Sequence, residues 1–243
     1  YRDKAARLKA AFNRDFWLPE QGYVALALDG SKRPVDALAS NMGHCLMTGI
    51  LDPDKAAAVA DKLLGPELFS GWGVRTLGTS MAAYNPVSYH NGSVWPHDNA
   101  LIAAGLVRYG FTAHAHRIIG ALLEVAALSD GRLPELFSGV DRSELPVPAP
   151  YPTSCVPQAW AAASPLLFLR SLLRFDPWMV RRKLWVAPEL PSWITRLAVS
   201  GIPLGDDRVG VACGDRGVQV TGLSSDIDLE THPRDPLTHA FDT

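Results

Sequence analysis

The sequence predicts a mainly α-helical fold, a ring of alternating outer and inner helices, followed by a small β-rich C-terminal appendage. Three observations predict this fold. Six segments repeat apolar residues with a period of about 3.6. The segments alternate between amphipathic and almost wholly apolar, and the links between them alternate between very short and long. Amphipathic helices keep one face in solvent, whereas helices that are apolar all round are covered by neighbours.

The predicted helices, in chain order, span residues 2–14, 36–50, 53–64, 97–110, 112–128 and 157–174. The first, third and fifth are amphipathic; in the first, Leu8 and Phe12 lie opposite Arg7 and Arg14. We expect these three to be outer helices. The second, fourth and sixth are apolar or small nearly all round, so we expect them to be inner helices.

Capping residues support two of these boundaries. Asp52 before Pro53 has the pattern of an N-cap followed by proline at the first helical position. Pro157 is expected to open the sixth helix in the same way.

The links between helices predict where function lies. The inner-to-outer links are only residues 51–52 and residue 111, whereas the outer-to-inner links run through 15–35, 65–96 and 129–156. Loops of that length in a compact domain are usually functional. Because all outer-to-inner links of such a ring leave from the same end, we expect the three loops to converge on one face.

The pattern changes after Asp176 and Pro177. Short alternating segments, 184–186, 197–199, 209–211 and 218–220, read as strands, with 214–217 as a hairpin turn. We therefore divide the chain into a helical domain over residues 1–178 and a β-rich appendage and tail over 179–243. From about Glu230 the tail is rich in Pro, His and Asp, and we expect it to be poorly ordered.

Composition narrows the class of protein. A formal net charge of −2 and the absence of a Lys/Arg-rich block argue against nucleic acid and membrane surfaces as partners. No run of 18 apolar residues and no cleavable signal pattern occurs, so we expect a soluble protein. Cys45, Cys155 and Cys213 form no even disulfide set, which favours a reducing, cytoplasmic compartment. His90 and His97 lack an apparent third ligand, so we expect no metal and no other cofactor.

The loop over residues 65–96 has the composition of a sugar site. It combines flat aromatic side chains with hydroxyl, amide and imidazole groups, and its glycines let backbone approach a ligand. The C–H faces of sugars pack on such rings and their hydroxyls need fixed donors and acceptors. The alternative is that Trp72 and Trp95 plug the ring and Arg75 pairs with a carboxylate.

The loop over residues 129–156 contains the best candidate for a catalytic base. Glu135 follows Pro134, which stiffens its backbone, and lies among apolar neighbours that can tune a carboxylate. The hexapeptide Pro-Glu-Leu-Phe-Ser-Gly at 134–139 also occurs at 66–71, after the preceding outer helix. Glu67 is therefore a geometric twin of Glu135, or it caps or pairs at the rim of the ring.

Several blocks together resemble the C-terminal half of the amylo-α-1,6-glucosidase (glycogen debranching) family, and more broadly the inverting α-glycosidases with an (α/α)6 toroid. The blocks are residues 40–44, 69–77, 89–96, 133–136 and 157–160, and the resemblance covers about residues 1–178. It implies that the six helices form half of an (α/α)6 toroid. It also implies hydrolysis of α-glucosidic linkages with inversion, by a general acid and a general base.

The resemblance also implies roles for individual residues. Glu135 matches the general base of the family. The residues that match its sugar pocket, or lie near it, are His44, Trp72, Arg75, Tyr89, His90, Trp95, Gln158 and Trp160. The acid of the family is an aspartate upstream of this half; Asp98 is the local candidate to replace it, or it caps the helix that begins near Asn99. Half a ring would expose its inner helices, so we expect the missing N-terminal half or a second chain to cover them.

The leading hypothesis is therefore a glycoside hydrolase, or the base-bearing half of one, that acts on α-linked glucose oligosaccharides or a small glucoside. One alternative is a sugar epimerase or isomerase on the same toroid, an enzyme class that usually moves protons with paired histidines. The other is a carbohydrate-binding fragment that kept the aromatic pocket and lost the acid.

Overall fold

The structure is a computed structural model of the chain, and it describes residues 1–235. It divides into two compact units, one of residues 1–167 and one that begins at Phe168. The division falls inside the last helix. Each unit is described by itself.

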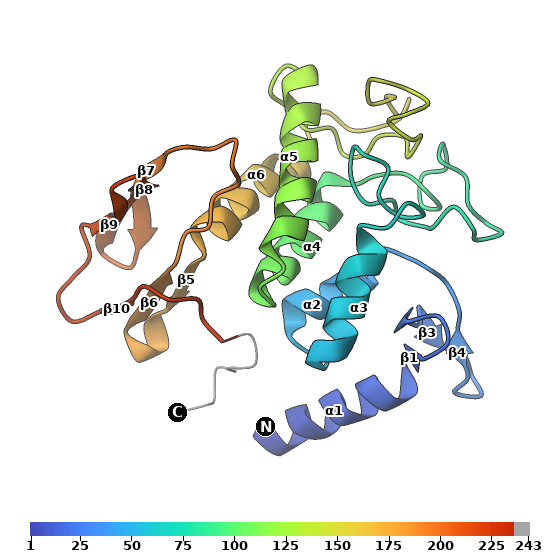
Figure 1. The fold of residues 1–243 in the computed structure, drawn as a ribbon, viewed down its shortest axis with the longest axis horizontal. Coiled ribbons are helices and arrows are strands. Elements are labelled where there is room, and N and C mark those ends of the chain that lie inside the picture. Colours follow the sequence, from blue (N-terminus) through green and yellow to red (C-terminus); the bar gives the residue numbers. More distant parts are fainter. Residues whose placement is uncertain (236–243) are drawn as a thin grey trace. The chain divides into compact units, whose positions relative to one another are not determined.

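The described residues contain six α-helices, close to the predicted ranges (Figure 1). They are α1 (Arg2–Asp15), α2 (Met42–Thr48), α3 (Pro53–Leu63), α4 (Pro96–Arg108), α5 (Thr112–Leu128) and α6 (Ala159–Leu173). They make up about a third of the chain. "Mainly α" was therefore too strong a description, because long loops and short strands account for most of the remaining residues.

The inner helices α2 and α4 pack directly on each other, with α3 against α2 and α5 against α4. Two glycines allow the close approach. A Cβ at Gly43 would lie 2.6 Å from Cγ1 of Ile102, and a Cβ at Gly105 would lie 2.6 Å from the backbone nitrogen of Met47. Helix α5 buries the face that the sequence predicted for an outer helix, including Ile118, Ile119 and Leu122.

Helix α2 begins six residues later than predicted. Residues 36–41 are extended because their backbone pairs with the following loop: Ala39 forms a bridge with Leu77, and Ser40 N–H donates to the carbonyl of Thr76. The apolar run that suggested helix is thus held by a tertiary hydrogen-bond pattern. Gly49, in the left-handed conformation at φ 73°, ends the helix.

Helix α1 does not pack as the amphipathic pattern predicted. Leu8 is 60% exposed, and the buried residue of this helix is Asn13. The Asn13 amide donates to the carbonyl of Ile50, and its oxygen accepts from the N–H of Asp52. Polar contacts at its C-terminal end, rather than an apolar face, hold α1 to the link between α2 and α3.

Of the three long loops expected to converge, the second and third meet at one end of the helices (Figure 1). Isolated bridges run from Arg75 to Val94, from Val94 to Phe137 and from Phe137 to Pro150. The first long loop is not structureless. It forms two antiparallel pairs, β1 (Trp17–Leu18) with β2 (Tyr23–Val24) and β3 (Ala27–Leu28) with β4 (Pro34–Val35), and β2 contacts α3.

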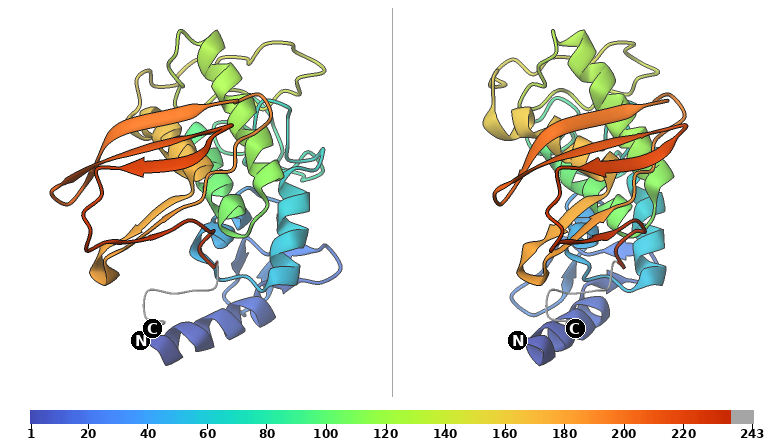
Figure 2. Two further views of the ribbon diagram at one scale, coloured as in Figure 1. Left: turned by 60° about the vertical axis from the view of Figure 1, so that its left-hand side comes forward. Right: turned by 90° about the vertical axis from the view of Figure 1, so that its left-hand side faces the viewer.

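The second unit contains two three-stranded sheets, orange to red in Figure 2. In one, β6 (Lys183–Val186) lies between β5 (Phe175–Trp178) and β10 (Asp228–Glu230); β5 is antiparallel to β6 and β10 is parallel to it. The other is an antiparallel meander of β7 (Leu197–Leu204), β8 (Asp207–Gly214) and β9 (Gly217–Thr221). A 3-10 turn, η1 (Met179–Arg181), joins β5 to β6.

The strand predictions for this unit are confirmed, and so is the hairpin, where Gly214 pairs with Gly217. The sequence missed β5 and β10. The core of the unit combines residues from both sheets and the end of α6: Leu173, Phe175, Leu184, Val186, Leu204, Val209, Val211, Cys213 and Ile227.

The predicted disorder from residue 230 is wrong where the structure can test it. Glu230 belongs to β10, and the Arg234 guanidinium lies 4.5 Å from the ring centre of Trp178 and 5.2 Å from that of Trp185. The remainder of that prediction, residues 236–243, lies outside the described residues. Within the described part of the chain, no helix is both long and apolar enough to cross a membrane.

Candidate active site

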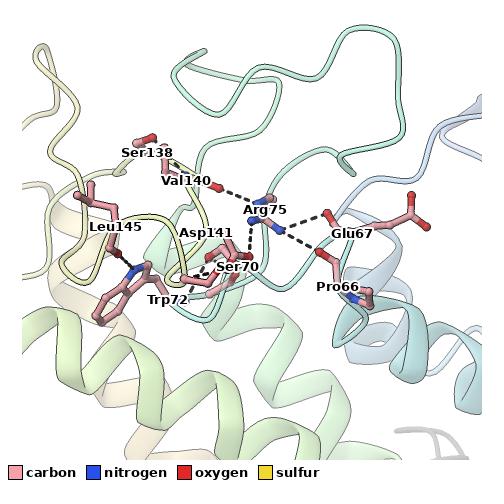
Figure 3. A network of polar contacts seen from close by, with 12 residues as sticks. Pro66, Glu67, Ser70, Trp72, Arg75, Ser138, Val140, Asp141 and Leu145 are labelled. Carbon is pink, nitrogen blue, oxygen red and sulfur yellow. Dashed lines mark hydrogen bonds and ion pairs between the residues drawn. The ribbon is translucent and has the colours of Figure 1, made fainter.

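A single buried guanidinium joins the two long loops that converge at one end of the helices (Figure 3). Arg75 is 2% exposed. Its Nη1 donates to the carbonyls of Pro66 and Glu67 at 3.2 and 3.4 Å, and its Nε donates to the carbonyl of Gly139 at 2.7 Å. These carbonyls belong to the two copies of the repeated hexapeptide, so Arg75 binds both copies to each other.

The charge of Arg75 is balanced by Asp141, 3.0 Å from its Nη2. The backbone N–H and hydroxyl of Ser143 and the Arg75 guanidinium together lower the pKa of Asp141, against the opposing effect of burial. The loops meet so tightly that a Cβ at Gly139 would lie 1.7 Å from the carbonyl oxygen of Gly92. Glycine is therefore required at position 139.

Trp72 is also a support of the loops. It is 1% exposed, its Nε1 donates to the carbonyl of Leu145 at 3.3 Å, and the Arg142 guanidinium lies 4.1 Å from its ring centre. Arg142 in turn makes two hydrogen bonds to Glu124 on α5. Trp72 and Arg75 therefore pack and pair within the protein, as the alternative interpretation of the sequence held, and their contact with a sugar stays a prediction.

Glu135 is held by two donors from other segments. The Tyr89 hydroxyl donates to Oε1 at 2.7 Å, and the backbone N–H of Cys155 donates to Oε2 at 3.1 Å. The Glu135 N–H donates back to the carbonyl of Cys155 at 3.1 Å. The hydrogen bond from Cys155, followed by that from Tyr89, lowers the pKa of Glu135, and the same contact raises the pKa of Tyr89 to about 12. Glu135 is therefore a carboxylate at neutral pH, able to accept a proton.

Aromatic rings surround this carboxylate. Tyr89 meets Trp95 edge-on, with ring centres 4.9 Å apart, and meets Tyr151 at 5.5 Å. The His90 ring is parallel to Trp95 at 6.1 Å. Trp95 itself is only 7% exposed and donates from Nε1 to the Ser93 hydroxyl and the Tyr89 carbonyl. Most of the Trp95 ring therefore packs inside the protein and supports the loop, as the alternative interpretation of the sequence predicted.

Two further rings extend the cluster onto α6. The His97 ring stacks on Trp160, with centres 4.2 Å apart and planes 7° apart, and meets Trp95 edge-on. Trp160 is 49% exposed, so it presents a large apolar face. The loop residues and the start of α6, far apart in sequence, meet here as the sequence predicted.

Gln158 caps α6 with its side chain, and its predicted contact with a sugar stays a prediction. Its side-chain oxygen accepts from the backbone N–H of Trp160 at 2.8 Å and of Ala161 at 3.3 Å. These contacts are those of an N-cap, and they explain why α6 begins at Ala159 and not at Pro157.

His44 and Asp98 form a second polar centre, between α2 and α4. His44 Nε2 lies 2.6 Å from Oδ1 of Asp98, and Asp98 is 6% exposed. This hydrogen bond raises the pKa of His44, against the opposing effect of burial. Asp98 makes no capping hydrogen bond, so the capping alternative for it is corrected.

Three residues of the site were not predicted to contribute to it: His97, Tyr151 and Cys155. His97 was considered only as a metal ligand, yet it connects the two polar centres: burial lowers its pKa, and Asp98, His44 and Glu135 all act on its charge. Tyr151 and Cys155 lie in a proline-rich stretch without a motif. Cys155 supplies backbone N–H and C=O groups, which any residue type provides, so no residue pattern could have identified it.

Glu67 does not repeat the environment of Glu135. Its carbonyl accepts from Arg75 and from the N–H of Thr79, and its side chain points away from Arg75 (Figure 3). Among residues 1–235, no group of three or more His, Cys, Asp and Glu side chains is arranged to hold a metal ion.

The site contains an ionised carboxylate, Glu135, beside aromatic rings. It also contains a histidine–aspartate pair, His44 and Asp98, on the inner helices. An ionised carboxylate can activate water, and aromatic faces of this kind can bind the C–H face of a sugar ring.

Comparison with known proteins agrees with this chemistry. The family model described as "Mannosylglycerate hydrolase MGH1-like glycoside hydrolase domain" matches residues 1–140. It supports a glycosidase of the toroid type and does not single out the amylo-α-1,6-glucosidases. The chain matches no curated protein.

Solved structures share the fold at low sequence identity. A sialidase matches 90% of this chain with a TM-score of 0.70 and 12% identity. A GH63 mannosylglycerate hydrolase from Thermus thermophilus, in complex with glucose, matches 68% with a TM-score of 0.53 and 20% identity. The neutral trehalase of Saccharomyces cerevisiae matches 70% with a TM-score of 0.53 and 16% identity. This chain covers 22%, 36% and 30% of those three chains, and its helices are consistent with a partial toroid.

Replacing Arg75 with methionine should destabilise the protein by about 3 kcal/mol or more, because the Pro66, Glu67 and Gly139 carbonyls lose a buried donor and Asp141 loses its partner. Urea unfolding measures the loss. Arg14→Met, which removes an exposed arginine paired with Asp15, is the control and should change little. Equal stability of the two variants would contradict the role of Arg75.

Replacing Tyr89 with phenylalanine should raise the pKa of Glu135 towards its ordinary value, because one of the two donors that stabilise the carboxylate is lost. The stability that Glu135 contributes is present above its unfolded-state pKa and is lost as pH falls through the lower folded-state pKa. The variant should therefore depend less on pH in the acidic range. Carboxyl NMR of Glu135 measures the pKa; Tyr151→Phe, which keeps the ring contact, should give a smaller change.

Proposed function

This chain belongs to the mannosylglycerate hydrolase MGH1-like glycoside hydrolase family, and on that premise we propose that it is the part of an inverting glycosidase that carries the general base. The observation that supports this most directly is Glu135, a carboxylate whose two oxygens each accept one hydrogen bond. Each carboxylate oxygen has a second lone pair, so a water molecule can still donate to it.

In the proposed reaction, Glu135 removes a proton from a water molecule as that water attacks the anomeric carbon. The water enters on the face opposite to the departing oxygen, and the anomeric configuration inverts. The lowered pKa of Glu135 suits this role, because a general base must be deprotonated before the reaction begins.

An inverting glycosidase also needs a general acid to protonate the departing oxygen. Asp98 is the local candidate, but its Oδ1 is hydrogen-bonded to His44. We propose that the acid belongs to the other half of the toroid, in the same protein or a second chain. This chain covers 36% of the mannosylglycerate hydrolase structure, which leaves ample room for that half.

The proposed substrate is a neutral or small glucoside with an α-glucosidic linkage, either an α-linked oligosaccharide or a compound of glucose with a small aglycone. Trp160 and the exposed His90 offer faces for a sugar ring, whereas Arg75 and Arg142 are already paired within the protein. The mannosylglycerate hydrolase of similar fold was solved in complex with glucose, which agrees with a glucose-sized site.

The other half of the toroid is the proposed partner of the inner helices. Met47 on α2 and Leu166 on α6 are 40% and 69% exposed, and apolar side chains of inner helices are normally covered.

One observation favours an epimerase or isomerase as a second candidate. His44 and His97 act on each other electrostatically, and their pKa values shift in opposite directions. Pairs of this kind can serve as acid and base in proton transfer. Conversion of one sugar into another without hydrolysis would identify that activity.

Replacing Glu135 with glutamine should abolish hydrolysis of α-glucosyl fluoride, with a loss of about 10²–10⁴-fold. This substrate is chosen because fluoride leaves with little help from an acid, so the base can be tested without the other half of the toroid. Proton NMR follows the reaction and identifies the first anomer released, which should be β-glucose.

Glu67→Gln is the matched control, since it changes the same residue of the other hexapeptide copy, and it should keep full turnover. Unchanged turnover in the Glu135 variant, or α-glucose as the first product, would contradict the mechanism.

Replacing Trp160 with alanine should weaken glucose binding by about 1–2 kcal/mol and leave stability nearly unchanged, because its exposed ring would lose contact with the ligand. Trp72→Ala should lower the free energy of unfolding by about 3–5 kcal/mol, because its ring is buried, and should change stability more than glucose binding. Saturation-transfer NMR and urea unfolding measure the two effects. If both variants bind glucose as the unaltered chain does, Trp160 is not part of the sugar site.

A further inference from the structure

The contact between His44 and Asp98 is short, and its two side chains differ in exposure. Its Nε2–Oδ1 distance is 2.6 Å, with the aspartate side chain 9% exposed and the histidine side chain 41% exposed. Asp98 is thus deep in the contact between α4 and α2, while part of the imidazole faces solvent.

Two polar atoms at this place have no hydrogen-bond partner among residues 1–235. They are Oδ2 of Asp98 and Nδ1 of His97, and both are buried. Buried polar atoms without a partner are uncommon, and each costs free energy relative to a satisfied group. A pair of apolar side chains would join α2 and α4 at lower cost, so a purely structural role does not account for the charged pair.

The pKa values of the two histidines at this site shift in opposite directions. Burial lowers the pKa of His97, whose ring stacks on Trp160, whereas the Asp98 carboxylate raises the pKa of His44. A carboxylate only accepts hydrogen bonds, so Nε2 of His44 is protonated and donates the hydrogen bond to Asp98. In the protonated ring Nδ1 is a donor as well, and it makes no hydrogen bond to the described residues.

We propose that His44 binds an oxygen atom of the substrate through Nδ1–H, and that Asp98 is the positioning residue that fixes its ring. This inference rests on the proposed function, since it supplies the sugar site with a second polar contact besides Glu135. Contacts link Glu135 to His97: Glu135 accepts from Tyr89, Tyr89 contacts Trp95, and Trp95 contacts His97. His97 in turn interacts electrostatically with His44 and Asp98, which affect its pKa. The oxygen belongs to a sugar hydroxyl or, with stronger binding, to a carboxylate on the aglycone.

The contact makes binding depend on pH. Protonated His44 donates from Nδ1, so affinity is highest below the pKa of His44 in the folded protein and falls as pH rises through it. A protonated His97 would repel the charge of a protonated His44. The lowered pKa of His97 keeps its ring neutral near pH 7, so this repulsion is absent there. Cys45, next to His44 on α2, remains a thiol, since burial raises its pKa to about 11.

The test uses the 243-residue chain with 15N-labelled histidine. Imidazole NMR gives the pKa and tautomer of His44 and His97, and titration with glucose and with glucosylglycerate between pH 5.5 and about 8.5 gives the affinity. We expect both ligands to shift the His44 signals. We expect His44→Gln to weaken binding about three- to tenfold at pH 6 and to remove its pH dependence.

Two further variants separate a binding role from a structural one. Asp98→Asn should lower the pKa of His44 and move the loss of affinity to lower pH, an effect that a structural contact would not produce. His114→Gln is the matched control, because His114 pairs with Asp61 across two outer helices at 3.2 Å, and it should bind glucose normally.

The outcomes are distinct. If sugars shift the signals of His97, whose ring stacks on Trp160, but not those of His44, and His44→Gln binds as tightly as the unaltered chain, this inference fails and the proposed function stands. If neither sugar shifts any signal of the site, both fail for this chain. Stronger binding of glucosylglycerate than of glucose, lost in His44→Gln, identifies the carboxylate as the acceptor; equal binding identifies a hydroxyl.

Discussion

The buried guanidinium of Arg75 is the interaction on which the rest of the site depends. It donates to carbonyls in both copies of the repeated hexapeptide, and so it ties the loop after α3 to the loop after α5. Glu135 lies four residues before Gly139, whose carbonyl accepts a hydrogen bond from Arg75. Between them Phe137 pairs with Val94, which places the segment of Tyr89 beside that of Glu135. These contacts fix the position of Glu135, as the role proposed for it as general base requires.

The two carboxylates of the site are stabilised in different ways. Glu135 receives a hydroxyl and a backbone N–H, so it remains an available proton acceptor with no cation attached. Asp98 is hydrogen-bonded to an imidazole, which makes the histidine the group that can act on a ligand. Contacts between the rings of Tyr89, Trp95 and His97 run from Glu135 towards Asp98. An ionised carboxylate near aromatic rings agrees with the glycoside hydrolase family to which the chain belongs.

The predictions agree with the structure where neighbouring residues determine an element. They differ from it where a contact with a distant segment determines a boundary or the role of a residue. The ranges of α3 and α5 follow from apolar spacing and from the proline at the first position of α3, and the hairpin at Gly214 to Gly217 follows from its turn residues. Helix α2 begins late because Ala39 pairs with Leu77. Trp72 has the residue type of a sugar platform, but its 1% exposure makes it a support. Gln158 caps a helix, a use that composition alone could not separate from ligand binding.

By itself, the sequence predicted that helices would alternate with long loops, that these loops would converge, as the second and third do, and that one of them would carry a carboxylate, Glu135, beside apolar residues. These follow from periodicity, loop length and residue type, which are properties of neighbouring positions. Only the tertiary structure decided which aromatic residues remain exposed, that Cys155 and Tyr89 supply the donors to Glu135, and that Asp98 faces His44. Those outcomes depend on burial and on the distance between atoms far apart in the chain, and neither is encoded at a single position.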